Sequence, residues 1–312
     1  MQNLRGINVN LLSAFKSSKI YKLIQENPTE VLACIRNNAI GIYYNADRIA
    51  MVSLDRNGKL KCSTNHYYLS GVSNSEANKT FLPDEIYDSF ELIKTNSDAR
   101  STLEKKAQQA LIYANNANPK SNWICADIEY RQSTKVQIEV TDKFTGRFDI
   151  IAISKATPHR IAIIELKYNG GAIGGEAGVV KHLKDFQCFN NQYCIGNLKK
   201  ELKDILNNLG ELELLDNPPI DIDVKNDFIS EIEFYMIFLY DTIESPRGTV
   251  GGYLFNEIHP EWGTKKVSTK NAEKELPLGS DILKKVNFLF KRVSGPTDLD
   301  IDDILDINNY EK

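Results

Sequence analysis

The sequence predicts an α/β (α+β) protein built around a mixed central β-sheet flanked by helices. Two consecutive segments, Phe148–Ser154 and Arg160–Lys167, are rich in isoleucine and alanine, as is typical of strands buried on both faces. A third segment, Glu233–Tyr240, is apolar at nearly every position and suits an interior strand. Helical patterns stand before and after the first two strands, at Ser101–Ala117 and Glu176–Gln192.

The length of 312 residues is that of about two domains. We expect an N-terminal α+β module at 1–98, a main domain at 99–296 and an acidic, solvated or partner-binding tail at 297–312. The net charge of −4 excludes a globally basic protein, so any contact with nucleic acid must use local basic patches.

The cysteine content and the N-terminus indicate a cytoplasmic protein. Five cysteines form an odd number without a CxxC pair, which argues against a disulfide framework and against a zinc site. The first ten residues lack the basic region and apolar core of a signal peptide. No apolar run is long enough to span a membrane, so we expect no membrane partner. The oligomeric state stays open, a homo-oligomer included.

The N-terminal module should contain two helices and an antiparallel sheet. Asn57-Gly58 is a good hairpin turn because both residues readily take positive φ. The predicted helices are Asn10–Phe15 and Lys19–Gln25, and the predicted strands are Val31–Arg36, Ala39–Tyr44, Arg48–Leu54 and Lys59–Ser63. Five residues of this sheet could grip a nucleic-acid strand or form its solvated face: Arg36, Tyr43, Tyr44, Lys59 and Lys61. A linker is expected at Asn96–Asp98.

The main domain adds further elements around the central strands. They are a strand at Trp123–Arg131, an extended arm at Thr134–Val140, a helix at Leu198–Leu209, a glycine loop at Gly248–Gly252 and a strand at Lys285–Val293.

Three ionisable residues interrupt the apolar strands of this domain. Asp149 opens the first strand, and Glu165 and Lys167 end the second, where their spacing of two places them on one face. Mg²⁺ takes one or two carboxylates and completes its shell with water and phosphate oxygens. The pattern therefore predicts a Mg²⁺ or Mn²⁺ site with Asp149, Glu165 and the backbone carbonyl of Leu166 as ligands. Lys167 would orient the attacking water and neutralise the phosphate. The alternative is structural: Glu165 and Lys167 would form an ordinary ion pair at the end of the strand.

Asp149 followed by Glu165-Leu166-Lys167 on the next strand resembles the signature of the PD-(D/E)XK, or restriction-endonuclease-like, nuclease superfamily. Phe148 stands where the family usually has proline. The order of predicted elements resembles the αβββαβ core of that superfamily over residues 99–241. The resemblance implies a divalent-metal-dependent nuclease that hydrolyses phosphodiester bonds in nucleic acid, with DNA favoured over RNA. It also implies a metal-binding role for Glu104 on the helix before the sheet, although Ser101–Glu104 equally fits a capping box.

Other residues could complete this site. Glu129, on the strand Trp123–Arg131, could approach the metal or face solvent. The helix after the glycine-rich segment Gly170–Gly175 offers four candidate substrate contacts: Lys181, His182, Lys184 and Gln187. The alternative for these four is an amphipathic helix with a solvated polar face. The alternative for the whole protein is an inactive nuclease-fold module that binds nucleic acid or acts in protein assembly.

Overall fold

The computed structural model describes residues 5–72, 78–133, 137, 143–170, 173–175, 178–254, 259–263, 265, 267 and 280–311. These residues form two compact units. The first consists of Met1–Gln109, Ala126–Ile128 and Lys199–Val224, and the second of Ala110–Cys125, Glu129–Leu198 and Lys225–Lys312. The division differs from the expected boundary at residue 98, because three strand residues and a long helical segment from the middle of the chain join the N-terminal module.

The first unit contains an antiparallel sheet with its strands in chain order. Its strands are β1 (Leu32–Arg36), β2 (Ala39–Tyr44), β3 (Asp47–Leu54), β4 (Leu60–Asn65) and β5 (Asn78–Phe81). Its helices are α1 (Val9–Lys16), α2 (Lys19–Glu26), α3 (Tyr67–Ser70), α4 (Pro83–Asp88) and α5 (Phe90–Arg100). The two predicted helices and four predicted strands are confirmed. The predicted linker at Asn96–Asp98 is wrong, because it lies within α5, where the Ser97 hydroxyl contacts Asp47 at 3.1 Å.

Three of the five residues of this sheet that were expected to contact nucleic acid or face solvent are buried or paired within the unit. Tyr43 and Tyr44 are buried. Arg36 Nη1 lies 2.5 Å from Asp127 Oδ1, and Arg5 Nη1 lies 2.8 Å from the other oxygen of that buried carboxylate. The guanidinium of Arg36 is therefore already bound inside the unit, whereas Lys59 is exposed and Lys61 is half-buried.

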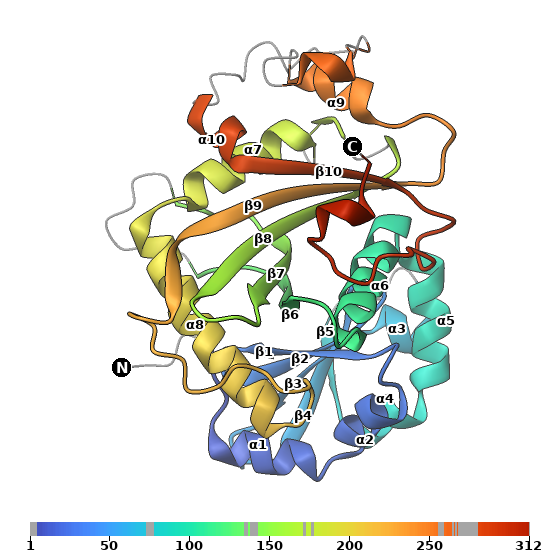
Figure 1. Cartoon of the computed structure of the whole chain (residues 1–312). Helices are drawn as coiled ribbons and strands as arrows, with labels where there is room; N and C mark the ends of the chain where they lie inside the picture. Colours follow the sequence, from blue (N-terminus) through green and yellow to red (C-terminus); the bar gives the residue numbers. More distant parts are fainter. Residues whose placement is uncertain are drawn as a thin grey trace. The chain divides into compact units, whose positions relative to one another are not determined.

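The second unit is built on a five-stranded mixed sheet in the order β10-β9-β8-β7-β6 (Figure 1). Strand β7 pairs with β8 in antiparallel fashion, whereas β8, β9 and β10 run parallel. The strands are β6 (Trp123–Tyr130), β7 (Phe148–Ser154), β8 (His159–Tyr168), β9 (Phe228–Tyr240) and β10 (Val286–Arg292). The side chains of β7 and β8 are almost entirely buried, which confirms the prediction of strands covered on both faces.

The second unit also contains helices, and two helices of the chain contribute residues to both units. These two are α6 (Leu103–Ala117) and α8 (Gln192–Glu211). The others are α7 (Val179–Phe189), α9 (Arg247–Tyr253) and α10 (Ser280–Lys285). The predicted glycine loop at Gly248–Gly252 is wrong because this segment is helical. A Cβ on Gly252 would lie 2.4 Å from the Lys265 carbonyl oxygen, so glycine permits close packing here rather than a loop. Most of the predicted arm Thr134–Val140 lies outside the described residues.

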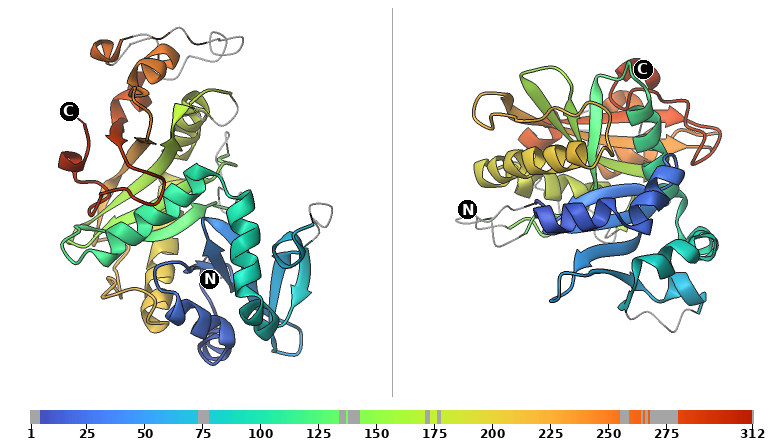
Figure 2. Two further views of the ribbon diagram at one scale, coloured as in Figure 1. Left: turned by 90° about the vertical axis from the view of Figure 1, so that its right-hand side faces the viewer. Right: turned by 90° about the horizontal axis from the view of Figure 1, so that it is seen from below.

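The acidic C-terminal segment packs against the second unit and is not a solvated tail. The Ile304 amide donates to Asn115 Oδ1 on α6 at 3.0 Å, and the Tyr310 hydroxyl donates to the Ile304 carbonyl at 2.7 Å. Figures 1 and 2 show the segment, in red, returning beside α6 and β10. Apolar residues alternate with the acids along it, and except for Ile307 they are buried: Leu299, Ile301, Ile304, Leu305 and Tyr310.

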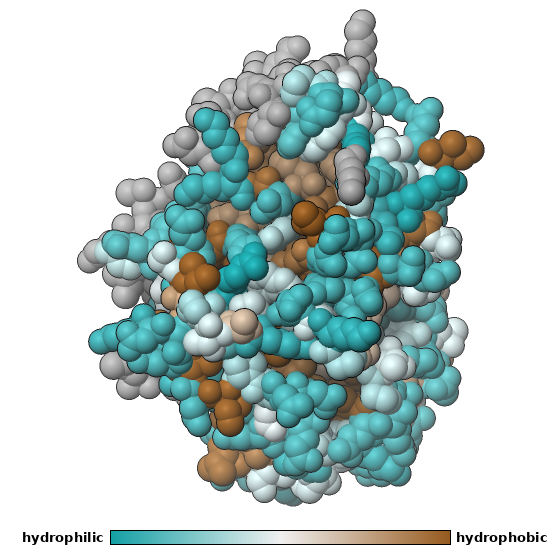
Figure 3. Space-filling view, viewed as in Figure 1, coloured by the Kyte–Doolittle hydropathy of each residue, from teal (hydrophilic) through white to brown (hydrophobic). Residues whose placement is uncertain are grey.

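The described part of the face in Figure 3 is mostly polar. Hydrophilic side chains cover most of the face shown in Figure 3, and the apolar patches between them are small. The most exposed apolar side chains, Ile243, Val9 and Ile307, are far apart in the sequence. Among the described residues, no helix is both long and apolar enough to cross a bilayer.

Candidate functional site

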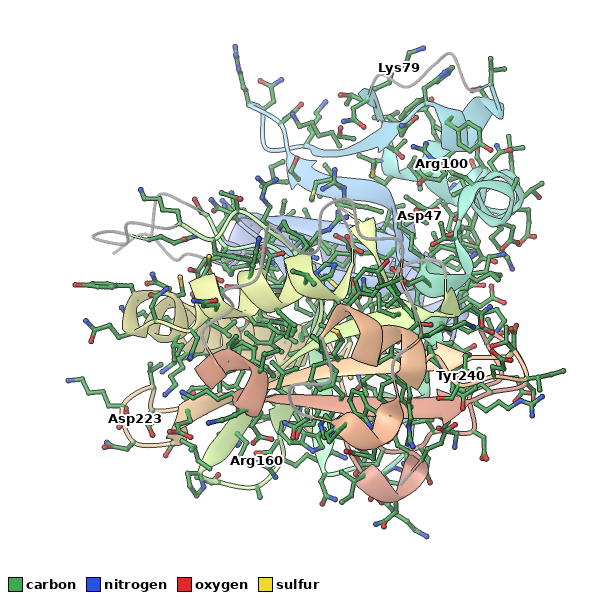
Figure 4. All side chains as sticks on the ribbon, turned by 90° about the horizontal axis from the view of Figure 1, so that it is seen from above. Asp47, Lys79, Arg100, Arg160, Asp223 and Tyr240 are labelled. Carbon is green, nitrogen blue, oxygen red and sulfur yellow. The ribbon has the colours of Figure 1, made fainter. Side chains whose placement is uncertain are left out.

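Asp149 and Glu165 each lie one residue beyond the last pair of the β7–β8 ladder. The last paired residues are Ile150 and Ile164, and the register brings Asp149 opposite Glu165 at the next position. Beyond this point the Leu166 amide donates to Asp149 Oδ2 at 2.8 Å. The candidate site therefore lies at the carboxyl end of β8. Figure 4 shows the two ends of the sheet, with Arg160 at the start of β8 and Tyr240 at the end of β9.

The main chain of Leu166 faces the same edge as Asp149. The amide of Asn169, three residues further on, donates to Leu239 on β9, so backbone groups of odd-numbered residues at this end of β8 point to β9. Those of even-numbered residues point to β7, because the amides of a strand alternate between its two edges. The N–H and C=O of one strand residue lie on one edge, and the Leu166 carbonyl is thus directed to the edge where the ladder has ended.

Glu165 and Lys167 form a buried charged cluster with His182. Both strand residues are only 2% exposed. Lys167 Nζ donates to Glu165 Oε1 at 2.8 Å, and His182 Nε2 lies 3.0 Å from the same oxygen and 3.2 Å from Lys167 Nζ. Two nitrogen groups therefore meet at one carboxylate oxygen.

The second oxygen of Glu165 is in a different situation. Oε2 is buried and has no hydrogen-bond partner among the described residues. Burial raises the pKa of Glu165, but the nearby His182 and Lys167 outweigh this effect and lower the pKa below its usual value of 4.5. The side chain is therefore an ionised carboxylate whose Oε2 is buried without a protein donor among the described residues, and burial of such a group costs on the order of 1–3 kcal/mol or more.

Aromatic packing fixes the helix that supplies His182. Phe148, the neighbour of Asp149, lies 5.5 Å from Phe186 and 5.2 Å from Phe189 between ring centroids. Phe186 also packs on Phe234 of β9, with a centroid separation of 4.9 Å. Helix α7 is thereby held against β7 and β9, and the stripe of α7 that carries His182 faces the site.

The structure adds Asp185, which the sequence analysis missed, to this cluster. Asp185 is 8% exposed, and its Oδ2 lies 3.9 Å from His182 Nδ1. Its Oδ1 lies 2.5 Å from Lys181 Nζ. A Cβ on Gly146 would meet Asp185 Cγ at 2.9 Å, so the carboxyl group packs directly against the main chain that leads into β7. The sequence does carry a signal for Asp185: it follows His182 by three residues and Lys181 by four, which places it on the same side of a helix.

The other two predicted contacts on α7 do not belong to this stripe. At roughly 100° per residue, Lys184 and Gln187 lie on the far side of the helix from His182. Gln187 is exposed and Lys184 is half-buried. The structure thus brings His182 to the site and places Lys181 beside it through Asp185, whereas it does not bring Lys184 and Gln187 there.

The two additional glutamates are not part of the cluster. Glu129 Oε2 lies 2.6 Å from Arg147 Nε, and its backbone has a positive φ of 54° that breaks the alternation of β6. Glu104 belongs to the first unit, on the first turn of α6. The Lys105 amide donates to the Thr102 hydroxyl at 3.3 Å, so the helix is capped one residue later than the expected capping box.

The donor set fits a hard divalent cation. An ionised, buried carboxylate oxygen without a donor is a group that Mg²⁺ or Mn²⁺ can ligate, and Asp149 and the Leu166 carbonyl offer further oxygens on the same edge. No group of three or more His, Cys, Asp or Glu side chains arranged for a metal occurs in the part of the chain that the structure describes. Two carboxylates completed by main chain, water and phosphate are nonetheless a common shell for Mg²⁺.

Comparisons with protein-family models, with curated proteins and with solved structures found no match for this chain.

Proposed function

We propose that this protein is a Mg²⁺- or Mn²⁺-dependent nuclease that hydrolyses phosphodiester bonds in DNA. Asp149 and Glu165 would hold the ion, and Lys167 would act on the water and the phosphate. The observation that carries the proposal is the buried Glu165 Oε2, which has no partner among the described residues while Oε1 is bound to Lys167 and His182. A purely structural ion pair would leave no reason for an unpaired oxygen beside a second carboxylate.

The chemistry follows from these residues. When bound, the ion lowers the pKa of a coordinated water and offsets charge that develops on the phosphate. The water oxygen attacks phosphorus, one ester P–O bond breaks, and the leaving oxygen takes up a proton. Lys167, held by Glu165 at 2.8 Å, presents an ammonium group that orients the water and neutralises a phosphate oxygen. Burial strengthens this interaction because water screens it less.

The fold is compatible with the proposal. Helix α6, strands β6, β7 and β8, helix α7 and strand β9 follow one another with only α8 added before β9, which resembles the αβββαβ core of restriction-endonuclease-like nucleases. The sheet order places the two carboxylate-bearing strands next to each other. All five cysteines are free thiols, which fits action in the reducing cytoplasm.

A cleavage assay tests the proposal. The purified chain is incubated with single- and double-stranded DNA and RNA in Mg²⁺, Mn²⁺, Ca²⁺ or chelator. We expect cleavage of DNA in Mg²⁺ or Mn²⁺, little in Ca²⁺, whose coordination shell is larger and looser, and none in chelator. Cleavage at full rate in chelator would exclude the metal mechanism.

Two variants connect the activity to the site. Lys167→Ala should cleave DNA about 10²–10³-fold more slowly and Asp149→Asn should be inactive. Asp204→Asn, a change at a half-buried carboxylate of α8 in the first unit, should keep full activity. Activity in Lys167→Ala equal to that of the unmodified protein would assign cleavage to a contaminant or to another site. Binding of DNA without cleavage under every condition would favour the inactive nuclease-fold module instead.

A further inference from the structure

The two carboxylate oxygens of Glu165 differ in their hydrogen-bond partners. Lys167 Nζ and His182 Nε2 both approach Oε1, at 2.8 and 3.0 Å, whereas Oε2 has no hydrogen-bond partner among the described residues. The two oxygens of a carboxylate are chemically equivalent, so this difference arises because both donors lie on one side of the group. Something must hold the group in one orientation, and Lys167 alone is a flexible chain with a rotatable ammonium.

His182 is the rigid, planar member of the cluster, with direct polar contacts on its Nε2 side and, on its Nδ1 side, an acidic group beyond hydrogen-bond distance. Its Nε2 edge meets Glu165 and Lys167, and its Nδ1 edge faces Asp185 Oδ2 at 3.9 Å. Asp185 is itself fixed, because Lys181 binds its Oδ1 at 2.5 Å and the main chain at Gly146 packs against its carboxyl group. The contacts therefore run in order from Lys181 to Asp185, His182 and Glu165.

We propose that His182 and Asp185 are positioning residues that orient Glu165, so that Oε1 is taken by protein donors and Oε2 is presented to the metal ion. This inference rests on the proposed function, since it assigns these residues to the support of the same metal site. His182 was expected to contact substrate, and this proposal gives it a different role.

The expected size of the effect follows from the behaviour of such supporting contacts. Removing an outer partner of a metal ligand typically weakens metal affinity or activity 10–100-fold, because the ligand must then be ordered at the expense of binding free energy. Asp185 touches no ligand directly and acts through His182. Its removal should therefore weaken Mn²⁺ binding less, by about 10-fold, and only while His182 is present.

The test measures Mn²⁺ binding to the full chain by calorimetric titration and by the loss of the free-ion electron paramagnetic resonance signal. Two His182 variants of similar volume separate polar contact from packing. His182→Gln retains a donor and an acceptor near the position of Nε2, and we expect its dissociation constant for Mn²⁺ to stay within about 3-fold of the unmodified protein. His182→Leu fills the space without a polar atom and should bind Mn²⁺ at least 10-fold more weakly. Equal affinities of the Gln and Leu variants, whether high or low, would overturn the proposal.

A double-mutant cycle tests the order of the contacts. Asp185→Ala should weaken Mn²⁺ binding in the unmodified background and have no further effect in the His182→Leu background. Independent, additive losses would show that Asp185 does not act through His182. Circular dichroism of each variant checks that the fold is retained, and Asp204→Asn serves as the control with unchanged Mn²⁺ affinity.

The outcome also distinguishes this proposal from the proposed function. If the unmodified protein binds no Mn²⁺, or if Glu165→Gln binds it as well as the unmodified protein does, the metal site itself is absent. If the unmodified protein binds Mn²⁺ and His182→Leu binds it equally well, the metal site stands and only the positioning role fails.

Discussion

Neutralising the two carboxylates one at a time should change the stability of the metal-free protein by very different amounts. Glu165 is buried with Lys167, and Glu165→Gln leaves that ammonium without a charged partner. Breaking a buried ion pair from one side costs about 3–5 kcal/mol. The glutamine oxygen can still accept one hydrogen bond from Lys167, so we expect about 3 kcal/mol. At roughly 2 °C per kcal/mol for a chain of this size, the melting temperature should fall by about 6 °C.

Asp149→Asn should cost far less. Asp149 is half-buried and accepts the Leu166 amide at 2.8 Å, and an asparagine Oδ1 can accept the same hydrogen bond. The change also removes one of two neighbouring negative charges. We therefore expect the free energy of unfolding to stay within about 1 kcal/mol of the unmodified protein or to rise.

The response to metal should then separate ligand from ion pair. Mn²⁺ at one hundred times its dissociation constant stabilises the unmodified protein by about 2.7 kcal/mol, or a rise of about 5 °C in melting temperature. Both variants should lose this rise, although only Glu165→Gln starts from a lower value. Scanning calorimetry with and without Mn²⁺ measures both quantities. A Glu165→Gln protein as stable as the unmodified one, or an Asp149→Asn protein that keeps the full Mn²⁺ response, would refute the reasoning.

Three further outcomes are expected. The pKa of Glu165 is lowered in the folded protein despite burial, because His182 and Lys167 favour the charged form. The ionised carboxylate therefore stabilises the fold above about pH 4.5, and this stabilisation is lost as the pH falls through the folded pKa. The difference in unfolding free energy between the unmodified protein and Glu165→Gln should accordingly be constant near neutral pH and shrink below pH 4.5 in denaturant titrations; a difference that grows in acid would contradict the direction of the shift. Lys167→Ala should lower single-turnover DNA cleavage by about 10²–10³-fold and leave the Mn²⁺ dissociation constant nearly unchanged, and a parallel loss of both would make the lysine a support for the ion. Ile304→Ala should destabilise the protein by about 2–5 kcal/mol in urea denaturation because Ile304 is fully buried, whereas a solvated C-terminal tail would give no change.

The sequence alone predicted the contacts of the candidate site that depend only on two consecutive strands. Asp149, Glu165 and Lys167 lie in a hairpin with a short connection, so strand periodicity was enough to bring Asp149 and Leu166 into contact and to place Glu165 beside Lys167. These two contacts are observed, whereas a shared metal site and a catalytic role stay predictions. Asp185 was missed because its importance depends on how α7 rotates against β7, which the phenylalanine contacts decide and the helical pattern does not.

Other features could not be predicted because the partners are remote or the backbone is irregular. Asp127 binds Arg5 and Arg36, 122 and 91 residues away in the chain, and no local pattern links them. Glu129 binds Arg147 from a left-handed backbone conformation that a glutamate rarely adopts. The high density of aspartates between residues 297 and 312 suggested a solvated tail, while the alternating apolar residues that anchor it were given too little weight.

The return of the C-terminus to β10 also protects the protein from other copies of itself. Strand β10 is the last strand of its sheet, and such a strand offers unpaired N–H and C=O groups to which a strand from another molecule can add. The Glu311 amide donates to the Phe290 carbonyl at 2.8 Å, so the chain covers part of this edge with its own end. Loss of the last few residues would therefore open a template for intermolecular β-pairing, and we expect proteolytic trimming at this end to be followed by aggregation even where the shortened chain is still folded.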